Sequence, residues 1–150
     1  MTQVIKHTYF FQHPVELVWE YFTTSELMTQ WLMKNDFQPV VGRDFQFRTG
    51  PIASLNFDGI FYCKVLAIDP LKQLSYTWNC GPGDGKITLE SVVTWNLQPK
   101  DNGTEVFLDH RGFEKAENLD LYNGLMHGWV EKLTKIDNLL KEAAHGHTNA

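Results

Sequence analysis

Clustered positive charge is missing from this sequence. Its 150 residues include 13 Lys and Arg against 18 Asp and Glu, giving a net charge of -5, and they contain no basic run or stripe. Proteins that bind nucleic acid need clustered positive charge to displace counterions from phosphates. The composition therefore predicts that nucleic acid is not a partner.

Long apolar runs are also missing. No stretch reaches the roughly 18 consecutive apolar residues that a membrane-spanning helix needs. The opening residues, MTQVIKHTYFF, lack the small-residue cleavage site of a secretory signal peptide. We therefore expect no membrane span and a cytoplasmic protein.

Residues suited to covalent or metal chemistry are few. Cysteine occurs only at Cys63 and Cys80, and in such a chain we expect two reduced thiols. The histidines lack metal-ligand spacing, and no G-x-S-x-G nucleophile elbow is present. The loop GPGDG (81–85) is followed by a strand-like run, whereas a phosphate cradle needs a helix there. The sequence thus predicts no metal and no cofactor.

Aromatic residues, by contrast, are abundant. Ten Phe, five Trp and five Tyr make up 13% of a chain that is 43% hydrophobic. A chain of this length is typical of one domain, so we treat residues 1–150 as a single unit with a frayed tail from about 145. Large rings fill cores, and they also line pockets for apolar ligands.

Hydrophobic periodicity predicts the order of the elements. A strand at 3–11 precedes two short helices at about 14–22 and 25–32, and the period of two then indicates five further strands. From about Glu117 to Ala143 the period becomes helical. We expect an α+β helix-grip fold: a curved six-stranded antiparallel sheet around one long C-terminal helix. Because a single helix covers the inner face, this architecture favours a cavity beside it.

Several segments resemble one known family. Pro14, Val18-Trp19 and Trp31 are followed by Gly42 and Phe45, then LSYTWN, SVVTWNL, GTEVFLDHRGF and Gly128-Trp129 in the last helix. Their order is similar to that of the START-like (Bet v 1-like, SRPBCC) superfamily, in the branch named after the C-terminal domain of the Hsp90 ATPase activator Aha1. The resemblance covers nearly the whole chain.

The resemblance implies several functions. The founder of the branch stimulates a chaperone and carries an additional N-terminal domain. Relatives in the superfamily carry lipids, polyketides, flavonoids or plant hormones, and a few catalyse cyclisations. We therefore consider a binding protein for a hydrophobic small molecule, a chaperone co-regulator acting through its outer sheet face or helix end, and a cyclase-like enzyme. Fold alone does not choose among them.

The predicted inner face favours the binding protein. Its members are nearly all apolar, and none is Asp or Glu. Only His110 and Tyr76 could act as positioned acids or bases, which argues against an enzyme. His110 could instead bond a ligand carbonyl or phenol, or be a structural histidine bonded to backbone or to Tyr76. The predicted cavity-lining residues are Trp31, Phe47, Tyr76, Trp78, Ser91, His110, Leu125, Trp129 and Leu133, and no residue is predicted to be catalytic.

Two glycines one turn apart, Gly124 and Gly128, interrupt the predicted long helix. Glycine destabilises a helix interior by about 1 kcal/mol relative to Ala, so a reason for both is expected. Close approach of helix to strand, room for a ligand and a hinge near the helix start all remain open.

Overall fold

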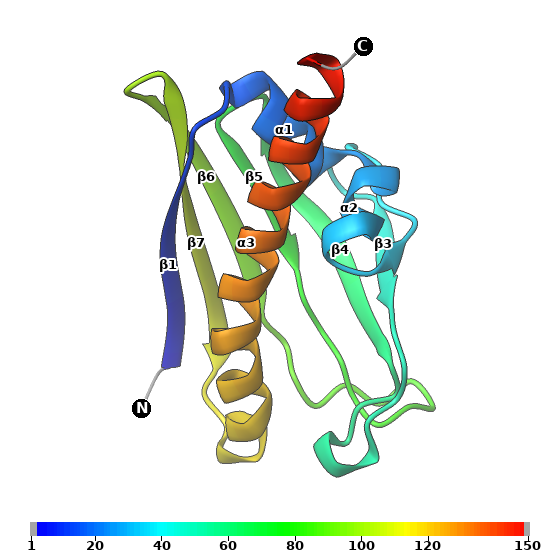
Figure 1. Ribbon diagram of the computed structural model, residues 1–150. Coiled ribbons are helices and arrows are strands. Elements are labelled where there is room, and N and C mark those ends of the chain that lie inside the picture. Colours follow the sequence, from blue (N-terminus) through cyan, green and yellow to red (C-terminus); the bar gives the residue numbers. More distant parts are fainter. Residues whose placement is uncertain (1–2, 149–150) are drawn as a thin grey trace.

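Seven antiparallel strands and three α-helices make up the computed structural model, which describes residues 3–148 (Figure 1). The spatial order of the strands is β1-β7-β6-β5-β4-β3-β2. The strands are β1 (Gln3–Phe11), β2 (Lys34–Asn35), β3 (Asp44–Arg48), β4 (Ile60–Asp69), β5 (Gln73–Thr77), β6 (Val92–Lys100) and β7 (Gly103–Phe113). The helices are α1 (Val15–Thr23), α2 (Ser25–Trp31) and α3 (Leu119–Thr148), with short 3-10 turns at Ala53–Leu55 and Ala116–Asn118.

The predicted α+β helix-grip fold is confirmed, with one more strand than the six expected. The additional strand, β2, has only two residues, paired with Phe47 and Arg48 of β3. Two residues cannot display a period of two, so the pattern could not reveal it. Helix α3 extends to Thr148, and the last residues of the predicted tail, 149 and 150, lie outside the described part.

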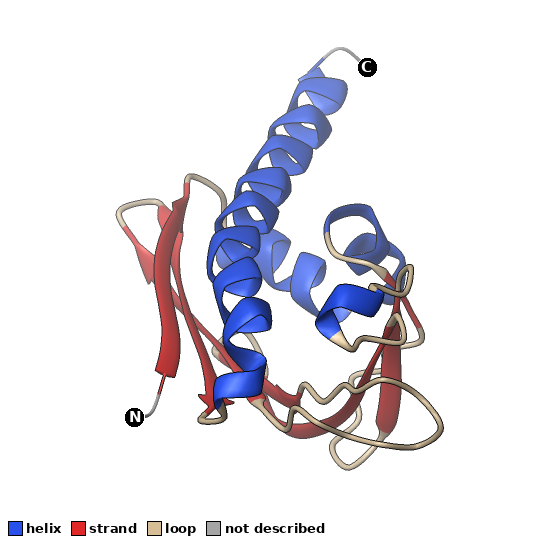
Figure 2. Ribbon diagram, turned by 90° about the horizontal axis from the view of Figure 1, so that it is seen from below, coloured by secondary structure: helices blue, strands red, loops and turns tan. Residues whose placement is uncertain are grey.

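The core lies between the sheet and α3. Alternate residues of β6 are buried, namely Val93, Trp95 and Leu97, and β7 buries Val106, Leu108 and His110 in the same way. From α3 the buried residues are Leu121, Trp129, Leu133, Ile136 and Leu140, and the last four follow one another at the three- and four-residue spacing of one helix face. Figure 2 shows α3 lying across the hollow side of the curved sheet.

Helices α1 and α2, which follow β1, cover the other end of the sheet face on which α3 packs. Trp31 of α2 donates its indole N–H to the Tyr21 carbonyl of α1 over 2.8 Å, which ties the two helices together. Its ring packs edge-on against Phe22 and Trp95, with centroids 5.4 and 6.3 Å away. In the described chain, no helix is both long and apolar enough to cross a membrane.

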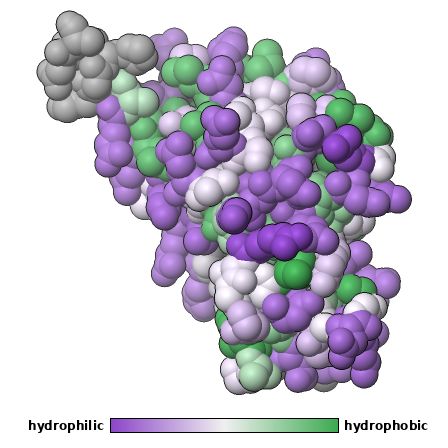
Figure 3. Space-filling model, turned by 90° about the vertical axis from the view of Figure 1, so that its right-hand side faces the viewer, coloured by the Kyte–Doolittle hydropathy of each residue, from purple (hydrophilic) through white to green (hydrophobic). Residues whose placement is uncertain are grey.

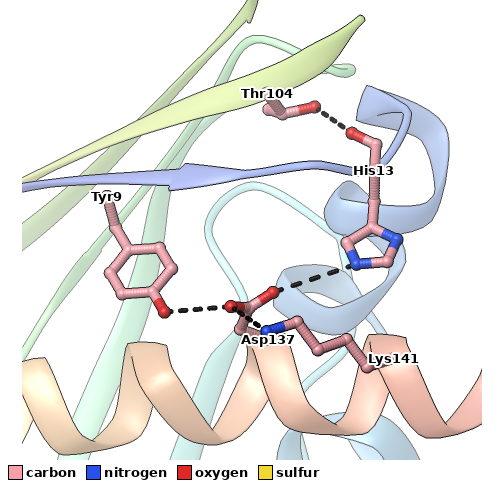
Figure 4. A network of polar contacts seen from close by, with 5 residues as sticks. All are labelled: Tyr9, His13, Thr104, Asp137 and Lys141. Carbon is pink, nitrogen blue, oxygen red and sulfur yellow. Dashed lines mark hydrogen bonds and ion pairs between the residues drawn. The ribbon is translucent and has the colours of Figure 1, made fainter.

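Polar contacts fasten one flank of α3 to β1. His7 bonds the Met126 carbonyl over 2.8 Å. Further along, Asp137 accepts from the Tyr9 hydroxyl (3.1 Å) and lies 3.8 Å from the His13 imidazole and 3.4 Å from the Lys141 ammonium (Figure 4). These contacts hold α3 beside the edge strand.

Candidate ligand-binding site

The residues predicted to line a cavity lie on α3 or on the elements that it packs against. Eight of the nine are buried, and Leu125 is half-buried on the helix. They come from strands β3, β5 and β7, from the residue after β5 and the residue before β6, and from helices α2 and α3. This convergence follows from alternation along the strands combined with helical spacing along α3.

Trp78 is the centre of this group. Its indole, fully buried just past the end of β5, contacts five aromatic rings. The centroid distances are 5.2 Å to Phe47, 4.3 Å to Phe61, 6.4 Å to Tyr76, 5.7 Å to His110 and 5.2 Å to Trp129. We call Trp78 and these five residues the aromatic cluster. Such pairs add stability beyond their buried area.

Trp31 lies outside the aromatic cluster. It touches Trp95, whose ring in turn meets Trp129 at 5.4 Å. With 1% of its surface exposed, Trp31 packs under the sheet and does not stand at a cavity mouth.

Phe61 is a member that the sequence reasoning missed. Among the rings around Trp78, the Phe61 ring has the nearest centroid, and the centroid of the Phe57 ring lies 4.7 Å from that of Phe61. The signal was available, because Phe61, Cys63 and Val65 alternate along β4 and all three are buried. A period of two read through this long apolar run would have placed Phe61 on the inner face.

Both ring nitrogens of His110 form hydrogen bonds. The Trp129 indole N–H donates to His110 Nδ1 over 3.1 Å, which places the ring proton on Nε2. That N–H donates to Ser91 Oγ over 2.9 Å, and the Ser91 hydroxyl donates to the Trp78 carbonyl. Every proton in this relay has an acceptor. The structural alternative for His110 named backbone or Tyr76 as its partners, whereas the partners in the structure are Trp129 and Ser91.

The surroundings of His110 keep its ring neutral. The side chain is fully buried among rings, and burial lowers the pKa of His110 to about 3, while the charge of Asp109 opposes that shift weakly. A neutral ring with both nitrogens engaged is suited to holding α3 on the sheet. It is poorly suited to moving a proton to or from a substrate.

Tyr76 is the second polar group of the inner face. Its hydroxyl oxygen accepts from the Trp95 indole N–H over 3.0 Å. Burial raises the pKa of the Tyr76 phenol, so it stays protonated at neutral pH. Burial likewise raises the pKa of the Cys63 and Cys80 thiols, and both thiols are free. None of these groups is prepared for nucleophilic chemistry.

The flank of α3 that faces away from β1 is open. Gly128 comes two residues after Met126, so it points to nearly the opposite side of the helix. Gly128 is half-buried, yet a Cβ added there would meet no atom within 4 Å; the same holds at the exposed Gly124. Close approach of helix to strand is therefore not the reason for either glycine.

Surface hollows occur on the other face of the sheet. One of them, about 700 Å³, has polar and charged side chains of β3, β4 and β5 in its lining. A neighbouring hollow shares Thr77 and Asn79 with it and reaches Arg111 and Glu114 near the end of β7. The side of the molecule carrying α2 and β3 likewise presents mainly polar residues with scattered apolar ones (Figure 3). We call these two hollows together the outer groove.

Comparison with protein families gives one clear match. The profile described as "Activator of Hsp90 ATPase homolog 1-like protein" matches residues 12–141. Curated proteins gave no sequence match.

Solved structures give close matches over nearly the whole chain. An X-ray structure of protein MLL2253 from Mesorhizobium loti is 35% identical, with a TM-score of 0.82 over 93% of this chain and 98% of that one. Protein BH1534 from Bacillus halodurans is 26% identical, with a TM-score of 0.70 over 92% and 98%. The Aha1 dimer from Colwellia psychrerythraea has the same fold at 18% identity, with a TM-score of 0.72 over 91% and 94%.

Proposed function

The chain belongs to the Activator of Hsp90 ATPase homolog 1-like family, and from that premise we propose that it binds a mostly apolar small molecule between the sheet and α3. The observation that carries this proposal is the aromatic cluster under a single helix. Its rings offer a large apolar surface, and removing apolar area from water provides about 25 cal/mol per Å² before the costs of association.

Charge supports a neutral ligand. Among the described residues, the buried polar side chains are Ser75, Ser91, Thr104, His110 and Asn118, and none of them is ionised at neutral pH. A charged ligand would lose its hydration without gaining a counter-charge, which is strongly unfavourable. Neutral aromatic or polycyclic compounds therefore fit this site best.

The open flank of α3 supports a route for the ligand. Trp78 is already surrounded by rings, so a ligand has to reach the aromatic cluster from its edge. Gly128 lies beside Trp129 on α3 and leaves open space there. Half-buried Leu125, one turn earlier, can move with little loss of packing. We expect the ligand to enter between this flank and α2.

Catalysis is disfavoured by the same geometry. A cyclase using His110 would need a free ring nitrogen, and both are bonded to protein. Tyr76 is a neutral phenol with its oxygen engaged by Trp95. The binding role needs neither group to titrate.

Intrinsic tryptophan fluorescence and thermal melting against flavonoids, sterols, fatty acids and polyketides test the proposal. A binding compound should quench saturably and raise the melting temperature; at 100 times the dissociation constant, linkage adds about 2.7 kcal/mol of stability. No response from any class would contradict the proposal.

Two variants locate the site. Gly128→Leu places a side chain in the open space and should weaken binding on the order of tenfold, the effect of about 1.4 kcal/mol. His127→Leu adds the same side chain at an exposed position of α3 and should bind like the parent. Equal weakening by both would place the ligand elsewhere.

A second candidate function is docking to a protein partner, an Hsp90-type chaperone in particular. The outer groove favours it, because its lining mixes Asp36, Asp44, Arg48, Lys64 and Arg111, the kind of polar surface that non-obligate partners use. Co-purification with a chaperone, lost on reversing the charge of Arg48 and Lys64 together, would support it. Absence of any complex would remove it.

A further inference from the structure

The indole N–H groups beneath α3 are paired with acceptors, with one exception. Trp31 donates to the Tyr21 carbonyl, Trp95 to the Tyr76 hydroxyl and Trp129 to His110. The Trp78 indole nitrogen, in a side chain with no exposed surface, meets no acceptor among the described residues. Trp78 is also the residue at the centre of the aromatic cluster.

A second proton donor lies on the same side of the sheet. The Tyr76 oxygen accepts from Trp95, and its own O–H has no acceptor in the described part of the chain. Tyr76 and Trp78 are two residues apart, so both side chains point to the inner face, with ring centroids 6.4 Å apart. The acceptors nearby are already used, since His110 Nδ1 and the Trp78 carbonyl each receive a proton. The inner face therefore has surplus donors and lacks acceptors.

We propose that Trp78 is the polar contact of the ligand, and that the ligand carries a neutral oxygen acceptor, a carbonyl or an ether, which the Trp78 indole N–H binds. This inference rests on the proposed small-molecule function and specifies the ligand class. A carboxylate would also accept, but it would bring a buried charge among residues that offer no cation. The aromatic cluster then selects a flat ring system and the indole N–H selects one oxygen on it.

Two probes of nearly the same shape test this assignment. Fluorenone and fluorene share three fused rings and differ by a carbonyl in place of a methylene group. Satisfying a buried donor should make fluorenone bind on the order of tenfold more tightly than fluorene.

Two variants assign that preference to one atom. Trp78→Phe keeps an aromatic ring and removes the N–H, so the ratio of the two dissociation constants should fall to near one. Trp95→Phe makes the same change where the N–H already has an acceptor, and it should keep the preference for fluorenone.

A spectroscopic measurement on the unaltered protein covers the case in which Trp78→Phe does not fold. In a ¹H–¹⁵N spectrum the Trp78 indole signal should move downfield with fluorenone and much less with fluorene. The Trp129 indole signal should keep its hydrogen-bonded position, because that N–H remains on His110.

The outcomes separate this inference from the proposed function. If both probes bind equally, or if bound fluorenone does not shift the Trp78 indole signal, the Trp78 assignment is wrong. The ligand-binding role stands in that case. If neither probe binds and no compound of the wider panel binds either, the Trp78 assignment and the proposed ligand-binding function are both wrong.

Discussion

His110 is a residue whose chemistry is decided by its neighbours. Trp129 and Ser91 satisfy the neutral ring, and burial lowers the pKa of His110 to about 3. In the unfolded chain the same side chain titrates near 6.5. At pH values between these two pKa values, His110 is therefore protonated in the unfolded state and neutral in the folded state.

This difference predicts the pH dependence of stability. As the pH falls from 6.5 toward 3, His110 should lower the free energy of unfolding by up to about 1.4 kcal/mol per pH unit. Urea unfolding at pH 7, 6 and 5 measures the slope in a range where carboxylates contribute little. His110→Gln should reduce the slope while lowering stability at pH 7, and His127→Gln, at an exposed site, is the matched control. An undiminished slope in His110→Gln would show that the ring titrates in the folded protein.

At the scale of elements, two glycines should respond oppositely to the same substitution. Gly124 in α3 has open space around it, so Gly124→Ala should raise the free energy of unfolding by about 1 kcal/mol through helix propensity. Gly112 in β7 has φ of +125° and would place a Cβ 2.7 Å from the Ser91 Cα, so Gly112→Ala should be strongly destabilising. Denaturant unfolding of both variants checks the pair. A destabilised Gly124→Ala would indicate that α3 approaches a neighbour closely.

The anchor of α3 on β1 makes a separate prediction. Asp137→Asn removes the charge that His13 and Lys141 face, and should cost about 0.5–1 kcal/mol because the group is mostly buried but near solvent. The loss should shrink at high salt. Glu131→Gln, an exposed acid of the same helix, is the control. Thermal melting at low and high ionic strength compares the two, and an equal change in both variants would argue that only net charge matters.

The elements themselves were largely predictable from the sequence. Alternation placed Tyr76, Trp78 and His110 on one face, and helical spacing placed Trp129 opposite them. What could not be predicted was which polar atoms would meet. The bonds Trp129–His110 and Trp95–Tyr76 join separate elements, and periodicity gives a side chain's face but not the position of its nitrogen. The unpaired Trp78 N–H is for the same reason visible only in the folded structure.

At the scale of the whole molecule, the two candidate functions use opposite faces of one sheet. A small molecule would lie between the sheet and α3, whereas a chaperone would contact the outer groove of β3, β4 and β5. The sheet separates these sites, so amide hydrogen exchange can distinguish them. Exchange reports local opening, and a bound partner slows it most where it stabilises the backbone.

When a compound binds, amide hydrogen exchange should therefore slow in residues 119–133 of α3, whose flank at Gly128 is open. When an Hsp90-type chaperone binds, amide hydrogen exchange should slow instead at residues 44–48 and 77–79. Residues 8–11 and 104–107 of the β1–β7 pair serve as an internal reference in both experiments, because their register is regular and they include no residue of the predicted cavity lining or of the outer groove. Protection confined to 119–133 by a neutral aromatic compound, with the chaperone having no effect, would favour the binding protein. The reverse pattern would make the aromatic cluster a structural core and the outer groove the functional surface.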